Sequence, residues 1–282
     1  MKKVIIILAA TTFAASATAA NETMRQDVNM PFYRIDFRAV ACYFDIKIND
    51  VSVFSMNMKS SFSVRIPVNH LILESGKQRL SVTIQPNTGE TEFDEDAAFA
   101  MTLQLYADTG NSLEHVEDIL EYDMADDKEN VMVYQTSFDA AVPYQITAWQ
   151  NSTDLNTVEN LRQKVETAYQ KLGEMITKKQ YDAFVDMMRE QEKRMAQSLY
   201  IDPESSKERM DGLIEDFENG FEFVPLSGGE TMYIYADGKL VCLKTDNGNS
   251  ALKFLNRETE EEMSVEIFFH LKKGDTELTV SP

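Results

Sequence analysis

Residues 33–56, YRIDFRAVACYFDIKINDVSVFSM, alternate apolar and polar side chains along most of their length. A period of two is typical of a β-strand with one buried face. The alternation stops at Asn49-Asp50, a pair that favours a tight turn between antiparallel strands. The stretch therefore predicts strands over 33–39 and 42–48 and a returning strand over Val51–Met56.

Alternating segments continue beyond this stretch, and glycine or proline separates many of them. The further expected strands are 62–66, 80–84, 101–105, a segment around 131–133, and 144–148. Seven or eight short strands with turn residues between them, and no helical period, are typical of an all-β sandwich. We expect such a sandwich over residues 24–150.

The apolar period changes after the polar connection at 151–160. Between Val158 and Ile176 the apolar residues recur at three and four, which is one face of a helix. Asn156 with Glu159 predicts a capping box at its start, and Thr177 with Gln180 predicts another where a second helix begins.

A third helix is expected from Asp202-Pro203 to Asn219-Gly220, because these pairs are typical start and stop signals. Strands return after Phe221. Residues 233–243, YIYADGKLVCL, predict a hairpin with a two-residue turn at Asp237-Gly238. Residues 155–282 are therefore expected to form an α+β domain, with helices packed on an antiparallel sheet.

The first 20 residues have the pattern of a secretory signal peptide, with a basic start, a short apolar run and small residues at the end. Cleavage near Ala19 or Ala20 would place the protein in the periplasm or outside the cell. No later stretch approaches the roughly 18 apolar residues that a membrane helix needs, so direct membrane insertion is not expected.

The formal net charge is −20, and it becomes −22 when Lys2 and Lys3 leave with the signal peptide. Nucleic acid and anionic lipid surfaces are poor partners for such a chain. Cys42 and Cys242 are the only cysteines. They predict either two buried thiols or a disulfide between the halves, which export would allow.

Motifs for catalysis are missing from the sequence. It holds no Gly-x-Ser-x-Gly elbow, His-Glu-x-x-His pair, glycine-rich phosphate loop or Cys-x-x-Cys. The alternation around residue 269 places His270 on the solvent face of a strand. We assign no catalytic residue and no metal ligand, and we favour a non-catalytic protein over an enzyme.

Acidic residues are concentrated between Glu90 and Glu129, where fourteen carboxylates face Lys128 as the only lysine or arginine. Calcium could bind Asp123, Asp126, Asp127 and Glu129, with His115 nearby, but the spacing of an EF-hand is missing. Alternatively, the segment consists of solvated loops and a short helix over 113–122 that keep the protein soluble. The third reading is a docking surface for a basic protein.

The docking reading leads to the preferred hypothesis of an exported non-catalytic binding protein, such as an inhibitor or immunity protein, that needs no cofactor. Its candidate partner-binding residues are Glu117, Asp118, Glu121, Asp123, Asp126 and Asp127. Two alternatives stay open. One is a glycan- or envelope-directed hydrolase or sugar-binding protein, and the other is a structural surface or fimbria-like subunit.

Overall fold

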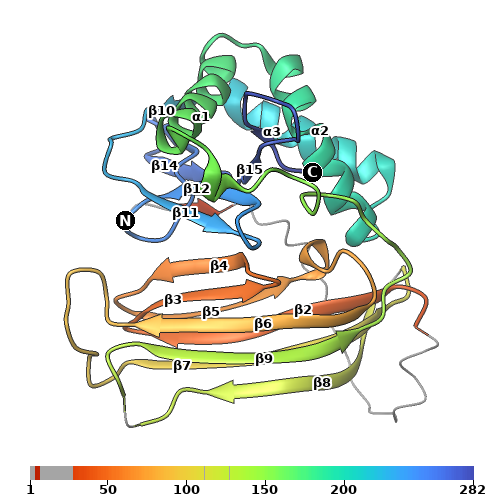
Figure 1. Ribbon diagram of the computed structural model, residues 1–282, viewed down its shortest axis with the longest axis vertical. Helices are drawn as coiled ribbons and strands as arrows, with labels where there is room; N and C mark the ends of the chain where they lie inside the picture. The colour runs from red at the N-terminus through yellow and green to blue at the C-terminus, as the bar shows by residue number, and fades with distance from the viewer. Residues whose placement is uncertain (1–3, 7–27, 111, 127) are drawn as a thin grey trace. The chain divides into compact units, whose positions relative to one another are not determined.

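The computed structural model describes residues 4–6, 28–110, 112–126 and 128–282. Over these residues the chain is mostly antiparallel β-structure in four sheets, with three α-helices, all in the C-terminal part (Figure 1). Two compact units divide the chain between Ile146 and Thr147, and the second unit also includes the described residues 4–6. The expectation of a mostly β chain with α-helices in its C-terminal part is confirmed.

The first unit contains eight strands in two four-stranded sheets, ordered β5-β2-β7-β8 and β4-β3-β6-β9 among the described residues. All neighbouring pairs in both sheets are antiparallel. The strands are β2 (Pro31–Val40), β3 (Tyr43–Ile48), β4 (Val51–Asn57), β5 (Ser61–Pro67), β6 (Gly76–Gln85), β7 (Ala98–Asp108), β8 (Leu113–Asp123) and β9 (Met132–Ala140).

The first hairpin forms as the alternation predicts. Ile48 pairs directly with Val51, so the turn between them has two residues. Asn49 and Asp50 both have positive φ, 52° and 62°, as a type I′ turn requires. This turn fixes which faces of β3 and β4 point toward the interior.

Phenylalanine rings from both sheets meet in one core. Phe37 of β2 lies 5.1 Å from Phe44 of β3 and 6.0 Å from Phe99 of β7, measured between ring centroids. Phe54 of β4 lies 6.0 Å from Phe44. All four are buried. The apolar faces of the two sheets therefore pack on each other.

Two predictions in the first unit are wrong. The segment predicted as a short helix, 113–122, is strand β8, paired with β7. Two shifts of register in this pair interrupt the alternation along β8, so its apolar residues fall at spacings that resemble a helix. Residues 144–148 are not a strand. The backbone N–H of Ile146 instead donates a hydrogen bond to the Leu73 carbonyl, at 2.8 Å.

The second unit contains α1 (Leu161–Thr177), α2 (Tyr181–Ser198) and α3 (Pro203–Glu218), and two four-stranded sheets among its described residues. The sheet orders are β1-β14-β13-β10 and β11-β12-β15-β16. The strands are β1 (Val4–Ile6), β10 (Phe221–Val224), β11 (Thr231–Tyr235), β12 (Leu240–Lys244), β13 (Lys253–Asn256), β14 (Glu261–Ser264), β15 (Phe269–His270) and β16 (Thr279–Val280).

One of the three predicted helix starts is confirmed. Asp202 caps α3 by accepting hydrogen bonds from the backbone N–H groups of Glu204 and Ser205, at 2.9 and 3.0 Å. At α1 the capping box predicted at Asn156 does not form. The Asp154 side chain captures the Asn156 N–H at 3.0 Å and caps a short 3₁₀ turn instead, so α1 begins only at Leu161.

The capping box predicted at Thr177 is also wrong. Thr177 is the last residue of α1, and its hydroxyl donates to the Gly173 carbonyl at 3.0 Å. The second helix begins at Tyr181, and no side-chain bond caps it. A threonine hydroxyl that bonds back into its own helix is not available to start the next one.

The hairpin predicted over 233–243 forms from β11 and β12, but its turn is longer than expected. Tyr235 pairs with Leu240, which leaves a four-residue loop in which Ala236, Asp237 and Gly238 all have positive φ. A Cβ at Gly238 would lie 2.6 Å from side-chain atoms of Asp154. This loop therefore packs against the segment that precedes α1.

Both cysteines are buried, as the buried-thiol alternative expects. Burial raises the pKa of Cys42 to about 11, which keeps it protonated and unreactive at neutral pH.

The predicted signal peptide lies outside the described residues, apart from β1, which pairs in parallel with β14. In the described part of the chain, no helix is both long enough and apolar enough to cross a membrane.

Candidate docking surface

Strand β8 lies at the end of its sheet and carries three carboxylates on one face. Asp118, Glu121 and Asp123 pair with Gln104, Thr102 and Ala100 of β7. These β7 residues alternate with the buried Met101, Leu103 and Leu105, so they point away from the core. The three carboxylates therefore share the outer face of the sheet, and all three are exposed.

A β-bulge brings these carboxylates together. Asp118 and Glu121 are three residues apart on β8, whereas their partners Gln104 and Thr102 are two apart on β7. The register shift at Leu103/Gln104 accommodates the extra residue. Without it, a strand would place Asp118 and Glu121 on opposite faces.

The other predicted partner-binding residues are arranged differently. Glu117 pairs with the inward-facing Leu105 and is half-buried, so it does not join the outer face. Asp126 is exposed in the loop between β8 and β9. Asp127 lies outside the described residues.

A polar pocket of about 370 Å³ lies between the loop that follows β6 and the loop that follows β8. It adds three carboxylates to the acidic surface, because the first loop contributes Glu92, Asp94 and Glu95. The described residues that line it are Glu92, Phe93, Asp94, Glu95, Asp126, Lys128 and Asn130.

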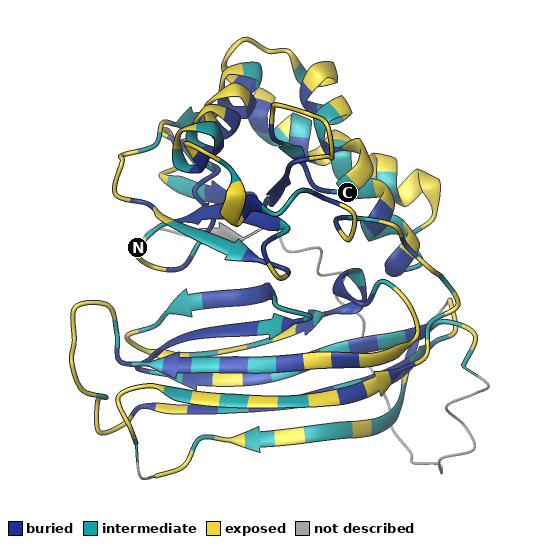
Figure 2. Cartoon of the chain, viewed as in Figure 1, coloured by how far each residue is buried: buried dark blue, intermediate teal, exposed yellow. Residues whose placement is uncertain are grey.

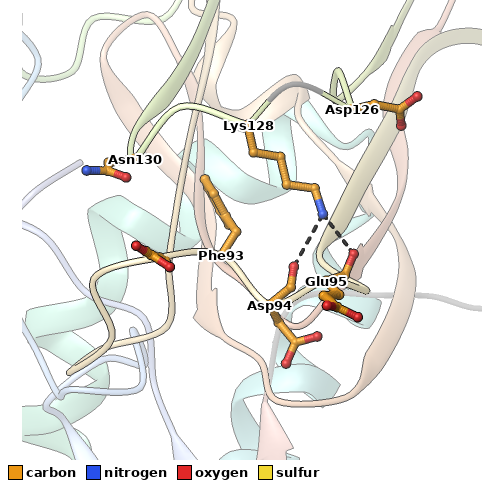
Figure 3. Close-up of a pocket in the computed structure, with 7 residues that line it drawn as sticks. Phe93, Asp94, Glu95, Asp126, Lys128 and Asn130 are labelled. Atoms are coloured by element: carbon orange, nitrogen blue, oxygen red, sulfur yellow. Dashed lines mark hydrogen bonds between the residues drawn. The ribbon is translucent and has the colours of Figure 1, made fainter.

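Lys128, the only lysine or arginine of the 90–129 segment, ties these two loops together (Figure 3). Its Nζ donates to the backbone carbonyls of Glu95 and Asp94, at 3.0 and 3.3 Å. The Asp126 carboxylate points away from this ammonium group in Figure 3. Since Lys128 bonds to main-chain oxygens, it stabilises the loops while their carboxylates stay available to a partner.

Arginines occupy the opposite side of the same sheet face. Arg34 and Arg38 of β2 pair with Gln104 and Ala100 of β7, and Arg65 of β5 lies across from Asp36. Strands are spaced by about 4.8 Å, so β2 is roughly 10 Å from β8. Asp36 on β2 offsets one of these charges through its ion pair with Arg65. The outer face is therefore divided into a net cationic side on β2 and β5 and an anionic side on β8.

Gln104 connects the two sides through hydrogen bonds. Its carbonyl accepts from Arg34 at 3.1 Å, and its amide donates to Asp118 at 2.8 Å. His115 Nε2 lies 2.9 Å from the same Asp118 oxygen. Partial burial alone would raise the pKa of Asp118, but the bonds from His115 and Gln104 outweigh it and lower the pKa. Asp118 is thus held ionised and fixed in place.

No group of three histidine, cysteine or acidic side chains is arranged to hold a metal within the described ranges. His115 contacts Asp118 rather than Asp123 or Asp126. Of the other two calcium candidates, Glu129 is exposed, and Asp127 lies outside the described residues. The calcium reading therefore receives no geometric support from the described residues.

Two features of the structure were not anticipated from the sequence. One is the exposed edge of β9, where Val131 and Val133 are 48% and 57% exposed. An alternating pattern identifies a strand, but it does not say which strand ends a sheet.

The second feature is His270, for which the predicted surface position is wrong. It is 2% exposed, and its Nδ1 lies 2.8 Å from the Ser152 hydroxyl. The segment around residue 269 is not one continuous strand, because β14 ends at Ser264 and β15 spans only Phe269–His270. Strict alternation therefore stops, and residues 267–271 are all buried.

Comparison of the chain with protein-family models, curated protein sequences and solved structures gave no match.

Proposed function

We propose that the chain is an exported, non-catalytic binding protein that docks a basic protein through its acidic surface. In this proposal residues 28–146 form a β-sandwich module and residues 147–282 an α+β module. The acidic surface consists of Asp118, Glu121 and Asp123 on β8 with Glu92, Asp94, Glu95 and Asp126 on the adjoining loops. The observation that carries the proposal is the shared outward face of the three β8 carboxylates.

Clustered exposed carboxylates favour recognition of a cationic protein for a physical reason. A concentrated field of one sign attracts opposite charge over about 8 Å at physiological ionic strength, which speeds encounter and disfavours acidic partners. The division of the sheet face also selects one orientation of the bound partner. The arginines of β2 and β5 would repel the cationic region of a partner that docks in the wrong position. Occlusion of a basic enzyme or toxin is then a sufficient mechanism.

The overall charge supports the same class of partner. A net charge of −20 opposes binding to nucleic acid and to anionic membranes. The proposed location is the periplasm or the exterior, as the N-terminal pattern predicts. No cofactor is required for docking by occlusion.

The test compares three baits in capture from the culture fluid of the producing cells at low salt. The baits are the wild type, the triple variant Glu121→Gln, Asp123→Asn and Asp126→Asn, and a control triple Glu208→Gln, Glu215→Gln and Glu218→Gln on α3. All six positions are exposed. Both triples remove three charges, but only the first alters the acidic surface.

We expect the wild type and the control triple to retain a basic protein that the acidic-surface triple does not retain. This protein should elute as the salt concentration rises. Retention by all three baits would show that net charge alone, rather than the β8 surface, attracts the partner. Binding that does not change with salt would contradict the proposal.

A further inference from the structure

Strand β9 presents an open, regular backbone edge. It is the last strand of its sheet, and within the described residues it pairs only with β6. The register runs without a shift from Gly76↔Ala140 to Ile84↔Met132. The backbone N–H and C=O groups on one side of this nine-residue strand therefore bond to β6, and those on the other side point outward.

The edge of β9 lacks the features that usually protect a terminal strand. Proteins prevent unwanted pairing with bulges, charged side chains or short edge strands. The neighbouring β8 has two register shifts and several carboxylates. In contrast, β9 has no register shift, and its only charged residue is Asp139.

Exposed apolar side chains lie at the start of this edge. Val133 and the preceding Val131 point to the same side of the chain and are the large hydrophobic residues that stand out as exposed. Figure 2 shows exposed positions alternating with half-buried ones along most of β9. A partner strand beside β9 would bury part of this apolar surface.

The charge around β9 decides which occupant fits. Asp126 and Glu129 precede the strand, and Tyr122 of β8 stacks on Tyr134 of β9 with ring centroids 4.3 Å apart. A strand added to β9 would therefore lie near the acidic surface. A second copy of the chain would bring its own carboxylates and a net charge of −20 to the same place. A cationic segment would gain attraction there instead.

We infer that β9 is the edge to which an extended, lysine- or arginine-containing segment of the basic partner adds as a fifth strand. Backbone hydrogen bonds supply the pairing, alternate apolar side chains cover Val131 and Val133, and the cationic ones face the acidic loops. This inference rests on the proposed function and specifies how the partner is held.

The test uses the full chain and a synthetic nine-residue peptide of alternating lysine and valine as a probe. A second peptide has the same sequence but carries N-methyl groups on four consecutive central residues. Consecutive strand residues direct their N–H groups to opposite sides, so these methyl groups block both edges of the peptide and leave its charge unchanged.

We expect the unmodified peptide to protect amides of residues 132–140 from hydrogen exchange and to bind roughly tenfold or more tightly than the methylated one. Val133→Lys should weaken its binding, whereas Ser63→Lys, an equal charge change at an exposed site on β5, should have a smaller effect. If both peptides bind equally and with the same salt dependence, the acidic surface acts without strand pairing and this inference fails alone. If neither peptide binds, the proposed function fails with it.

Self-pairing gives a separate readout. Light scattering and hydrogen exchange are followed as the concentration of the protein alone increases. Dimers in which residues 132–140 become protected would assign the edge to a second copy and overturn the inference.

Discussion

Tyr122 of β8 stacks on Tyr134 of β9, with ring centroids 4.3 Å apart and the rings inclined by 21°. The two strands end different sheets, so side chains rather than backbone bonds join them at this side. Burial, and secondarily Tyr134, raises the pKa of Tyr122. The pair therefore holds the acidic β8 beside the open edge of β9.

A double-mutant cycle tests this link. We expect Tyr122→Leu and Tyr134→Leu to show a coupling of about 0.5–1.5 kcal/mol in the free energy of unfolding, the range for aromatic pairs beyond their buried area. Denaturant unfolding followed by circular dichroism on the wild type, both single variants and the double variant gives this value. Additive single effects would show that the stacking contributes nothing beyond burial.

Replacement by alanine should have opposite effects on stability at Gly173 and at Gly212. A Cβ at Gly173 on α1 would overlap the ring of Phe223, whereas one at Gly212 on α3 meets nothing within 4 Å. Phe223 packs beside Phe254 at 6.1 Å between centroids, which restricts its escape. We expect Gly173→Ala to lower the free energy of unfolding by about 1–3 kcal/mol and Gly212→Ala to raise it by up to about 1 kcal/mol.

The only tryptophan, Trp149, lies in the same unit as both glycines, so its fluorescence reports this unfolding. The two variants control for each other, since both replace a helical glycine by alanine. An equal effect of the two changes would mean that α1 does not approach β10 as closely as Gly173 indicates.

Lys128 should stabilise the two acidic loops in a salt-dependent way. Lys128→Met removes bonds to two carbonyls and the one positive charge of the 90–129 segment. We expect it to lower the free energy of unfolding by about 1 kcal/mol at low salt, and by less at high salt because repulsion among the carboxylates is then screened. Circular dichroism at two ionic strengths measures the difference.

Lys59→Met is the matched control, because Lys59 is exposed on the turn between β4 and β5. It removes the same charge outside the acidic segment. Equal losses from both variants would assign the effect of Lys128 to net charge rather than to its bonds.

The parts of the fold that sequence predicts are those governed by local geometry. The alternation of 33–56 and the Asn49-Asp50 turn predict β2, β3 and β4, since both depend only on neighbouring residues. The start of α3 follows from Asp202 for the same reason. Local signals fail where another side chain forms a competing hydrogen bond. Before α1, the Asp154 side chain accepts the hydrogen bond from the Asn156 N–H, and the predicted capping box does not form.

The candidate site depends on nonlocal geometry and was harder to predict. Sequence identifies the acidic segment, but the bulges that bring Asp118 and Glu121 to one face and separate Glu117 appear only in the pairing with β7. The open edge of β9 depends on strand order, which alternation does not encode. Charge composition therefore indicates the region, and register determines which of its side chains act together.

His270 predicts a loss of stability in mild acid. Burial, and then Lys272, lowers its pKa from 6.5 to about 4, with Asp275 opposing the shift. Below about pH 6.5 the unfolded chain binds a proton at His270 that the folded chain does not, so acid favours unfolding. The loss should grow as pH falls from about 6.5 to about 4, reach about 3 kcal/mol, and then level off. His270→Asn should remove this part of the pH dependence. Unfolding followed by Trp149 fluorescence at several pH values measures it, and the contribution of the carboxylates cancels because both proteins contain them. Parallel curves for wild type and variant would show that His270 does not titrate on unfolding.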